Sequence, residues 1–276
     1  MAFDGFVISN IVSELQDKIL GGRIYKIYQP ESDEITLVIK KEKNTLRLHI
    51  SASASLPLIY LTTETKTNPM QAPNFCMLLR KHLSNGRIVS ICQPEFERII
   101  DITVEHLDEL GDLCQKHLIV ELMGKHSNII FTDSEHMILD SIKHISANIS
   151  SVREVLPGRT YCAPPSKNKH SILNLTPQFF TNEIIKKPVN LTKALYTSIT
   201  GMSPLIANEI CYRAGLDGSD STDSLTEEYA GGLYGQLLKL KTAVEDKEYQ
   251  PNIVYYKDEP KEFSCIALTS YADGEE

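Results

Sequence analysis

The chain has 276 residues, 42% hydrophobic and 23% charged, a balance typical of a globular protein with one large domain or two ordinary ones. No apolar run approaches the ~20 residues of a membrane span, and the N-terminus lacks the basic segment of a signal peptide, so we expect a cytoplasmic protein. Six scattered cysteines without a C-x-x-C pair indicate free thiols and argue against both a disulfide scaffold and a structural zinc site.

The net charge of −8 is unevenly distributed along the chain. Residues 217–276 contain 14 acidic and 5 basic residues, which leaves 23 basic and 22 acidic residues in the rest of the chain. Residues 65–94 contain no Asp or Glu, and residues 166–193 contain five lysines and Glu183 as the one acid. Such local positive stretches are compatible with binding a polyanion, although a solvated basic face has the same composition.

The N-terminal part predicts a helix followed by a β-rich region. Asp4 can cap a helix over 5–20, whose apolar residues recur at helical spacing. A second helix is predicted over 74–83. Predicted strands cover 23–29, 34–40, 45–51, 56–61, 87–93, 98–105, 116–123 and 137–145. Glu97 and Arg98 would point to opposite faces of a regular strand, unless a bulge or strand end after Pro94 brings both to one side.

Residues 121–131 form the most informative motif of this region. Two apolar strands flank a short polar turn in which Gly124 can adopt a positive φ. Lys125, His126, Ser127 and Asn128 would then project as donors for phosphate and sugar oxygens. The alternative is a structural turn whose Ser and Asn side chains bond to their own backbone.

The C-terminal part reads as helical over 177–185, 191–199, 204–214 and 225–244, and it ends in a hairpin near 253–268. Ser203 is a good N-cap and Pro204 suits the first helical position. The amides of Gly201, Met202 and Ser203 could therefore form an anion site for a nucleic-acid phosphate. A simple capped corner between two helices is the alternative.

No enzyme motif is present among those that can be recognised from sequence, such as a P-loop, a G-x-S-x-G elbow or H-E-x-x-H. Glu97 and Glu121 could form a carboxylate pair, but the basic residues Arg98 and Lys125 nearby indicate neutralising ion pairs. We therefore expect no catalytic residue, no bound metal and no cofactor.

Five segments together resemble the NFACT family, which includes the bacterial RqcH group, historically labelled fibronectin- or fibrinogen-binding proteins, and the eukaryotic nuclear export mediator factor. These segments are MAFDG at the start, Arg80 to Leu83, Glu97-Arg98, Glu121 to Asn128, and Gly201 to Pro204. The resemblance implies an α+β fold. An NFACT-N domain would cover 1–170, similar to the N-terminal β-sandwich of formamidopyrimidine DNA glycosylases with flanking helices. A helix-hairpin-helix domain would follow over 171–250, and 251–276 would be a terminal hairpin leading to a coiled coil and an NFACT-R domain.

The resemblance also implies a role in ribosome-associated quality control. Such proteins bind the large ribosomal subunit obstructed by peptidyl-tRNA and recruit alanyl-tRNA, so that untemplated C-terminal alanine tails are added while the ribosome supplies peptidyl transfer. The family's Asp-Arg pair falls on Glu97 and Arg98, with glutamate in place of aspartate. The expected tRNA-binding residues are Glu97, Arg98, Glu121, Leu122, Met123, Lys125, His126, Ser127 and Asn128, with 201–203 as a phosphate-binding hairpin.

Two other functions stay open at this point. A glycosylase-like DNA-binding protein would share the scaffold but not the lyase chemistry, because Ala2 and Phe3 replace the nucleophilic N-terminal proline and its glutamate. The historical label suggests that the protein is an adhesin for host fibronectin or fibrinogen. The absence of a signal peptide argues against this as its primary role.

Overall fold

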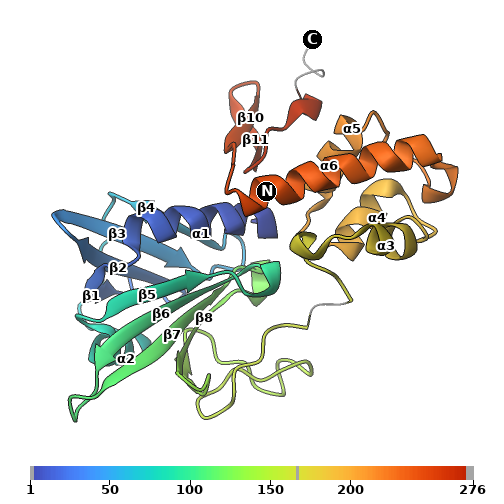
Figure 1. The fold of residues 1–276 in the computed structure, drawn as a ribbon. Helices are drawn as coiled ribbons and strands as arrows, with labels where there is room; N and C mark the ends of the chain where they lie inside the picture. Colours follow the sequence, from blue (N-terminus) through green and yellow to red (C-terminus); the bar gives the residue numbers. More distant parts are fainter. Residues whose placement is uncertain (1–2, 166–167, 272–276) are drawn as a thin grey trace.

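The computed structural model describes residues 3–165 and 168–271, and it shows a mixed α/β protein with a large antiparallel sheet (Figure 1). The sheet half contains helices α1 (Gly5–Ile19) and α2 (Asn74–Leu83). Its strands are β1 (Arg23–Tyr28), β2 (Glu34–Lys41), β3 (Asn44–Ser51), β4 (Leu58–Thr62), β5 (Arg87–Cys92), β6 (Ile99–Leu107), β7 (Leu113–Glu121), β8 (Asn128–Asp133) and β9 (Ile138–Ser141). They follow the order β4-β3-β2-β1-β5-β6-β7-β8-β9, with each neighbouring pair antiparallel.

The sheet folds over at the junction of β1 and β5. These strands share a single pair of facing residues, Arg23 and Arg87, whereas β6 and β7 pair along their whole length. Figure 1 shows the two leaves, β1–β4 and β5–β8, diverging from this junction. Apolar side chains of both leaves, such as Leu48 and Phe131, belong to one hydrophobic cluster that also includes residues of α1 and α2. The expected sandwich therefore takes the form of one folded sheet around a common core.

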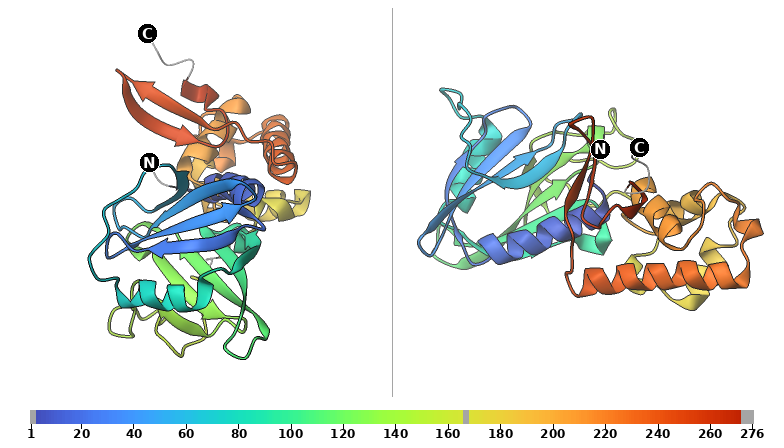
Figure 2. Two further views of the ribbon diagram at one scale, coloured as in Figure 1. Left: turned by 90° about the vertical axis from the view of Figure 1, so that its left-hand side faces the viewer. Right: turned by 90° about the horizontal axis from the view of Figure 1, so that it is seen from above.

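The helical half follows in sequence and lies at the other end of an elongated molecule (Figure 2). It contains α3 (Pro177–Phe179), α4 (Leu191–Ser198), α5 (Pro204–Arg213) and α6 (Glu227–Glu245), followed by the hairpin of β10 (Asn252–Tyr256) and β11 (Glu259–Ser264). Helix α1 contributes to both cores, because Ile8 packs in the sheet half while Phe6 and Val7 join the cluster of the helical half. In the described residues, no helix is long and apolar enough to cross a membrane.

Most predicted elements are present, and the differences have local causes. Helix α2 begins and ends where the pattern predicts, and Asp4 caps α1 by accepting hydrogen bonds from the amides of Phe6 and Val7. The predicted helix over 177–185 is instead one short α-turn that continues as a π-helical turn. The Pro177 carbonyl there accepts from the Phe180 amide and also from the Thr181 hydroxyl, at 2.9 Å. This side-chain bond competes with regular helical bonding.

Two glycines bring the halves into backbone contact. The Gly5 amide donates to the Gly201 carbonyl at 2.7 Å. Gly201 has a φ of +71°, and a Cβ there would lie 2.6 Å from the Phe96 carbonyl oxygen and 2.7 Å from the Gly5 Cα. Since both obstacles are backbone atoms, no side-chain rotation can relieve the clash. Any larger residue would push the two halves apart.

We expect Gly201→Ala to destabilise the protein by roughly 1–3 kcal/mol, because it adds both a steric clash and an unfavourable φ. Urea unfolding followed by circular dichroism would measure this. Gly231→Ala is the matched control, since Gly231 lies inside α6 with open space around its Cβ position. The control should stabilise by about 0.5–1 kcal/mol. Equal effects of the two substitutions would contradict the proposed close packing.

Candidate nucleic-acid interface

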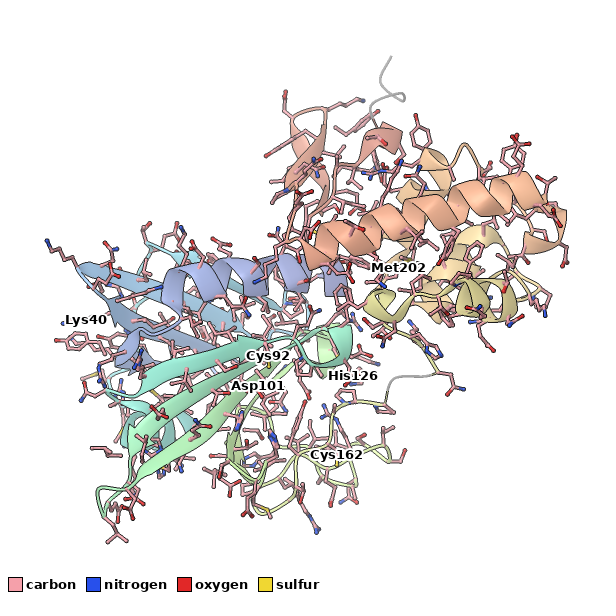
Figure 3. All side chains as sticks on the ribbon, in the orientation of Figure 1. Lys40, Cys92, Asp101, His126, Cys162 and Met202 are labelled. Carbon is pink, nitrogen blue, oxygen red and sulfur yellow. The ribbon has the colours of Figure 1, made fainter. Side chains whose placement is uncertain are left out.

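A cleft of about 270 Å³ lies at the junction of the two halves. It is lined by Phe3, Asp4, Glu97, Arg98, Lys169, Gly201, Met202, Ser203 and Pro204. Two stretches that the sequence singles out separately, Glu97-Arg98 and 201–203, thus face the same space. Figure 3 shows Met202 at this junction and His126 at the end of the sheet that approaches it.

Glu97 and Arg98 reach the cleft because the chain turns sharply just before β6. Pro94–Phe96 form a 3₁₀ turn in which Glu95 and Phe96 have φ values of +50° and +60°. Such backbone strain persists only where the surroundings enforce it. The surroundings here include Phe96, which packs edge-on against Phe6 with ring centroids 4.9 Å apart. The strand begins only at Ile99, so the interpretation that a strand end brings both side chains to one side is confirmed.

The cleft contains two cations, Arg98 and Lys169, together with the carboxylates of Asp4 and Glu97. Within the described ranges 3–165 and 168–271, the side chains of Arg98 and Lys169 form no salt bridge. Burial lowers the pKa of Lys169, as does the positive charge of Arg98, whereas Glu97 acts in the opposite direction. An incoming anion would offset this repulsion.

Lys169 was missed by the sequence reasoning. It belongs to the lysine-rich stretch 166–193, but nothing in that composition distinguishes it from its neighbours. Its place in the cleft depends on how the two halves pack.

Glu121 does not face the cleft. Its carboxylate is fully buried and accepts hydrogen bonds from both terminal nitrogens of Arg153, one of them at 2.8 Å, and from the Tyr161 hydroxyl at 2.9 Å. The expectation that Glu121 pairs with Arg98 or Lys125 is therefore wrong. Its partners lie 32 and 40 residues later, in a loop where sequence alone gives no pairing signal.

Most of the remaining turn has a structural role. Leu122 is buried, and its amide donates to the Arg98 carbonyl at 2.9 Å. Ser127 accepts from the amide of Met123, a half-buried residue, at 2.8 Å. Asn128 is buried and bonds to the backbone of Lys143 through both its side-chain oxygen and nitrogen.

Only Lys125 and His126 of the predicted donors are exposed. Ser127 and Asn128 therefore hold the turn by bonding to the backbone, as the alternative interpretation states. Only Lys125 and His126 stay available as donors for phosphate or sugar oxygens. The Leu122–Arg98 backbone bond keeps these two donors at the same end of the sheet as the cleft.

The hairpin at 201–203 already has an anion beside it, the carboxylate of Asp4. Ser203 caps α5 by accepting from the Ile206 amide at 3.3 Å, and its hydroxyl donates to Asp4 at 2.6 Å. Gly201 uses its carbonyl for the contact with Gly5, and Met202 is buried. The hairpin therefore forms a wall of the cleft, and the hydroxyl of its capping residue Ser203 is already bonded to Asp4. No group of three or more potential metal ligands is found among the described residues.

Comparison with known proteins agrees with this architecture. The family model for the NFACT N-terminal and middle domains matches residues 4–276. The chain belongs to the NFACT family. It is 35% identical to the Rqc2 homolog RqcH of Bacillus subtilis over 276 residues, which cover 100% of this chain and 46% of that protein.

Two further relatives extend the comparison. The human ribosome quality control complex subunit NEMF is 24% identical over 218 residues, covering 79% of this chain and 19% of NEMF. The crystal structure of the fibrinogen binding protein from Staphylococcus aureus superposes with a TM-score of 0.83 at 30% identity, covering 98% of this chain and 92% of that one. The chain thus spans less than half the length of the RqcH and NEMF relatives.

We expect Glu121→Gln to destabilise the protein by about 3 kcal/mol or more, because it leaves the Arg153 charge without its buried counter-ion. Chemical denaturation would give the change in unfolding free energy. Glu154→Gln is the control, since Glu154 pairs with Arg159 at a partly exposed site and should change stability by less than about 1 kcal/mol. If Glu121→Gln were as mild as the control, the buried pair would not be a main support of this region.

Proposed function

We propose that this chain is the tRNA-binding part of a ribosome-associated quality-control factor. It binds the large ribosomal subunit obstructed by peptidyl-tRNA and recruits alanyl-tRNA for untemplated alanine tailing of the stalled chain. The observation that supports the proposal is the convergence of Arg98 and Lys169 in the cleft between the two halves, where neither forms a salt bridge with a described residue. Family membership supports the ribosomal context, as does the name of the human relative.

Arg98 is the central residue of the proposed interface. Its guanidinium offers a planar fork of donors that matches a phosphate or a base edge, which the single ammonium of a lysine does not reproduce. Its carbonyl is fixed by the Leu122 amide, so the side chain projects from an ordered backbone. Lys125 and His126 extend the donor surface at the same end of the sheet.

Glu97 supplies the acceptor of the same cleft. A carboxylate can accept from the 2′-hydroxyl of a ribose or from an amino group on a base edge. The glutamate is one methylene longer than the aspartate of the family pattern, which changes its reach but not its charge. The corner between α4 and α5 serves, in this proposal, as a helix-hairpin-helix unit whose hairpin sets the shape of the cleft.

The expected effect of Arg98→Ala is tRNA binding weakened about ten- to a hundredfold at low salt, with an unchanged melting temperature. Arg98→Lys should also be impaired, because charge without the fork is insufficient. Fluorescence anisotropy with labelled tRNA would measure both, with Lys43→Ala, an exposed turn lysine, as the control. Full affinity in Arg98→Ala, or loss of its fold, would refute the assignment.

The protein acts, we propose, as a positioning factor and not as an enzyme. Phe3 lines the cleft without an ionisable group, and Ala2 lies outside the described residues. Neither residue type supplies the amine-and-acid pair that glycosylase chemistry uses. Incubation with a duplex containing a damaged purine, followed by borohydride reduction, should therefore yield no covalent adduct. A trapped adduct would favour the glycosylase-like alternative.

Binding of host fibrinogen or fibronectin is the second candidate, and the name of the Staphylococcus aureus relative is the observation that favours it. The two functions separate on one substitution. Arg98→Ala should weaken tRNA binding and leave binding to immobilised fibrinogen unchanged. A parallel loss of both would mean that one surface serves both ligands.

A further inference from the structure

A second basic cleft lies at the end of the sheet remote from Arg98. It measures about 440 Å³ and is lined by Arg23, Lys81, His82, Ser84, Asn85, Arg87, Glu105, His106, Leu107 and Leu113. These residues come from the first residues of β1 and β5, the last turn of α2 and the turn that follows it, and the far ends of β6 and β7. The acid-free stretch 65–94 contributes two of its four lysines and arginines, Lys81 and Arg87, to this cleft and none to the Arg98 cleft.

Arg23 and Arg87 face each other across the single pairing of β1 with β5. Like charges placed directly opposite in a sheet repel and destabilise the pairing. Glu105 faces Arg87 across the pairing of β5 with β6 and lines the same cleft, but neither arginine forms a salt bridge in the described part of the chain. Arg23 is held in place by a 3.0 Å hydrogen bond to the Asn85 carbonyl, a neutral acceptor that leaves the charge of its guanidinium unpaired within the described residues. An anion bound between Arg23 and Arg87 would offset their mutual repulsion.

The neighbouring groups reinforce the positive potential. Lys81 pairs with Glu109 at 3.1 Å, but both side chains are highly exposed, at 61% and 85%, so this contact is weak and easily exchanged. The pKa of His82 is lowered by burial and then by the positive charges of Lys116 and Lys81. The groups that face His82 are thus mainly cationic, with Glu109 as the opposing acid.

We propose that Arg23, Lys81 and Arg87 form a second RNA-binding site that grips backbone phosphates independently of the Arg98 cleft. Two guanidinium groups and an ammonium suit phosphate oxygens, and such contacts position an RNA without reading its sequence. Strand β6 connects the two clefts and separates them by about 27 Å at ~3.4 Å per residue. The inference rests on the proposed function, because it assigns the same class of ligand to a second surface.

The decisive measurement is the salt dependence of tRNA binding by this chain, since phosphate contacts are independent of sequence and any structured RNA reports on them. The slope of log K against log salt is negative, and each lost phosphate contact should reduce its magnitude by about 0.7–0.9. We therefore expect Arg23→Ala/Arg87→Ala to reduce that magnitude by about 1.4–1.8. Lys26→Ala/Lys43→Ala removes the same charge from exposed positions outside the cleft and should leave the slope within error.

The outcomes separate the two proposals. A reduced slope in both Arg23→Ala/Arg87→Ala and Arg98→Ala supports both sites. A reduction in Arg98→Ala alone overturns the second site and leaves the proposed function intact, and the converse result overturns the Arg98 assignment. An equal reduction in the lysine control would show that net charge alone is responsible, which also overturns the second site.

Stability provides the final check. Removal of the facing arginines should leave the melting temperature nearly unchanged, because the repulsion between them is lost together with the attraction of Glu105 for Arg87 and the hydrogen bond from Arg23 to Asn85. If the double variant instead unfolds, Lys81→Ala decides, since Lys81 is an exposed residue of α2 and lies outside the sheet. A slope reduced by about 0.7–0.9 in Lys81→Ala supports the site, and an unchanged slope overturns it.

Discussion

The arrangement of the two halves depends on one buried carboxylate, that of Asp4. It accepts from the Phe6 and Val7 amides at the start of α1 and from Ser203, the N-cap of α5. Burial raises the pKa of Asp4, and these donors, with the nearby charge of Arg98, act against that shift. Because helix N-termini attract negative charge, a single anion can stabilise the starts of two helices at once. Loss of the carboxylate would remove the cap of α1 and the polar link between the halves together.

The Asp4 contact fixes the cleft because everything around it is packed. Gly5 and Gly201 meet backbone to backbone, and α1 places side chains in both hydrophobic cores. The strained turn before β6 is anchored by Phe96 in the core of the helical half. Arg98 therefore projects from a rigid support into a space whose opposite wall is rigid as well. Preorganisation of this kind lowers the ordering cost that a nucleic acid would otherwise impose on binding.

The sequence predicts the parts of this structure that depend on residues close together in the chain, and it does not predict the contacts between distant residues. Helix α2, the Asp4 and Ser203 caps and the strand end before β6 are determined by neighbours within a few residues, and the sequence predicts them. Partners distant in sequence were not predictable. Arg153 pairs with Glu121 only because the intervening loop brings it back to the sheet. Arg23 faces Arg87 only because the sheet folds so that β1 and β5 are neighbours. Lys169 reaches the cleft only once both halves are packed, so composition could indicate a basic stretch but not its position.

Burial separates residues that a motif groups together. Glu121 and Arg98 both belong to segments typical of the family, yet Glu121 is enclosed by Arg153 and Tyr161, whereas Arg98 faces an open cleft. Arg153 also donates to the Cys162 carbonyl, in the loop that precedes Lys169. A substitution at Glu121 can thus loosen that loop and disturb the proposed RNA-binding cleft without any contact between Glu121 and RNA. Loss of function after substitution of such a buried residue therefore shows ligand contact only if stability is measured alongside and is unchanged. The charged groups of the two clefts differ from Glu121 because a ligand can reach them.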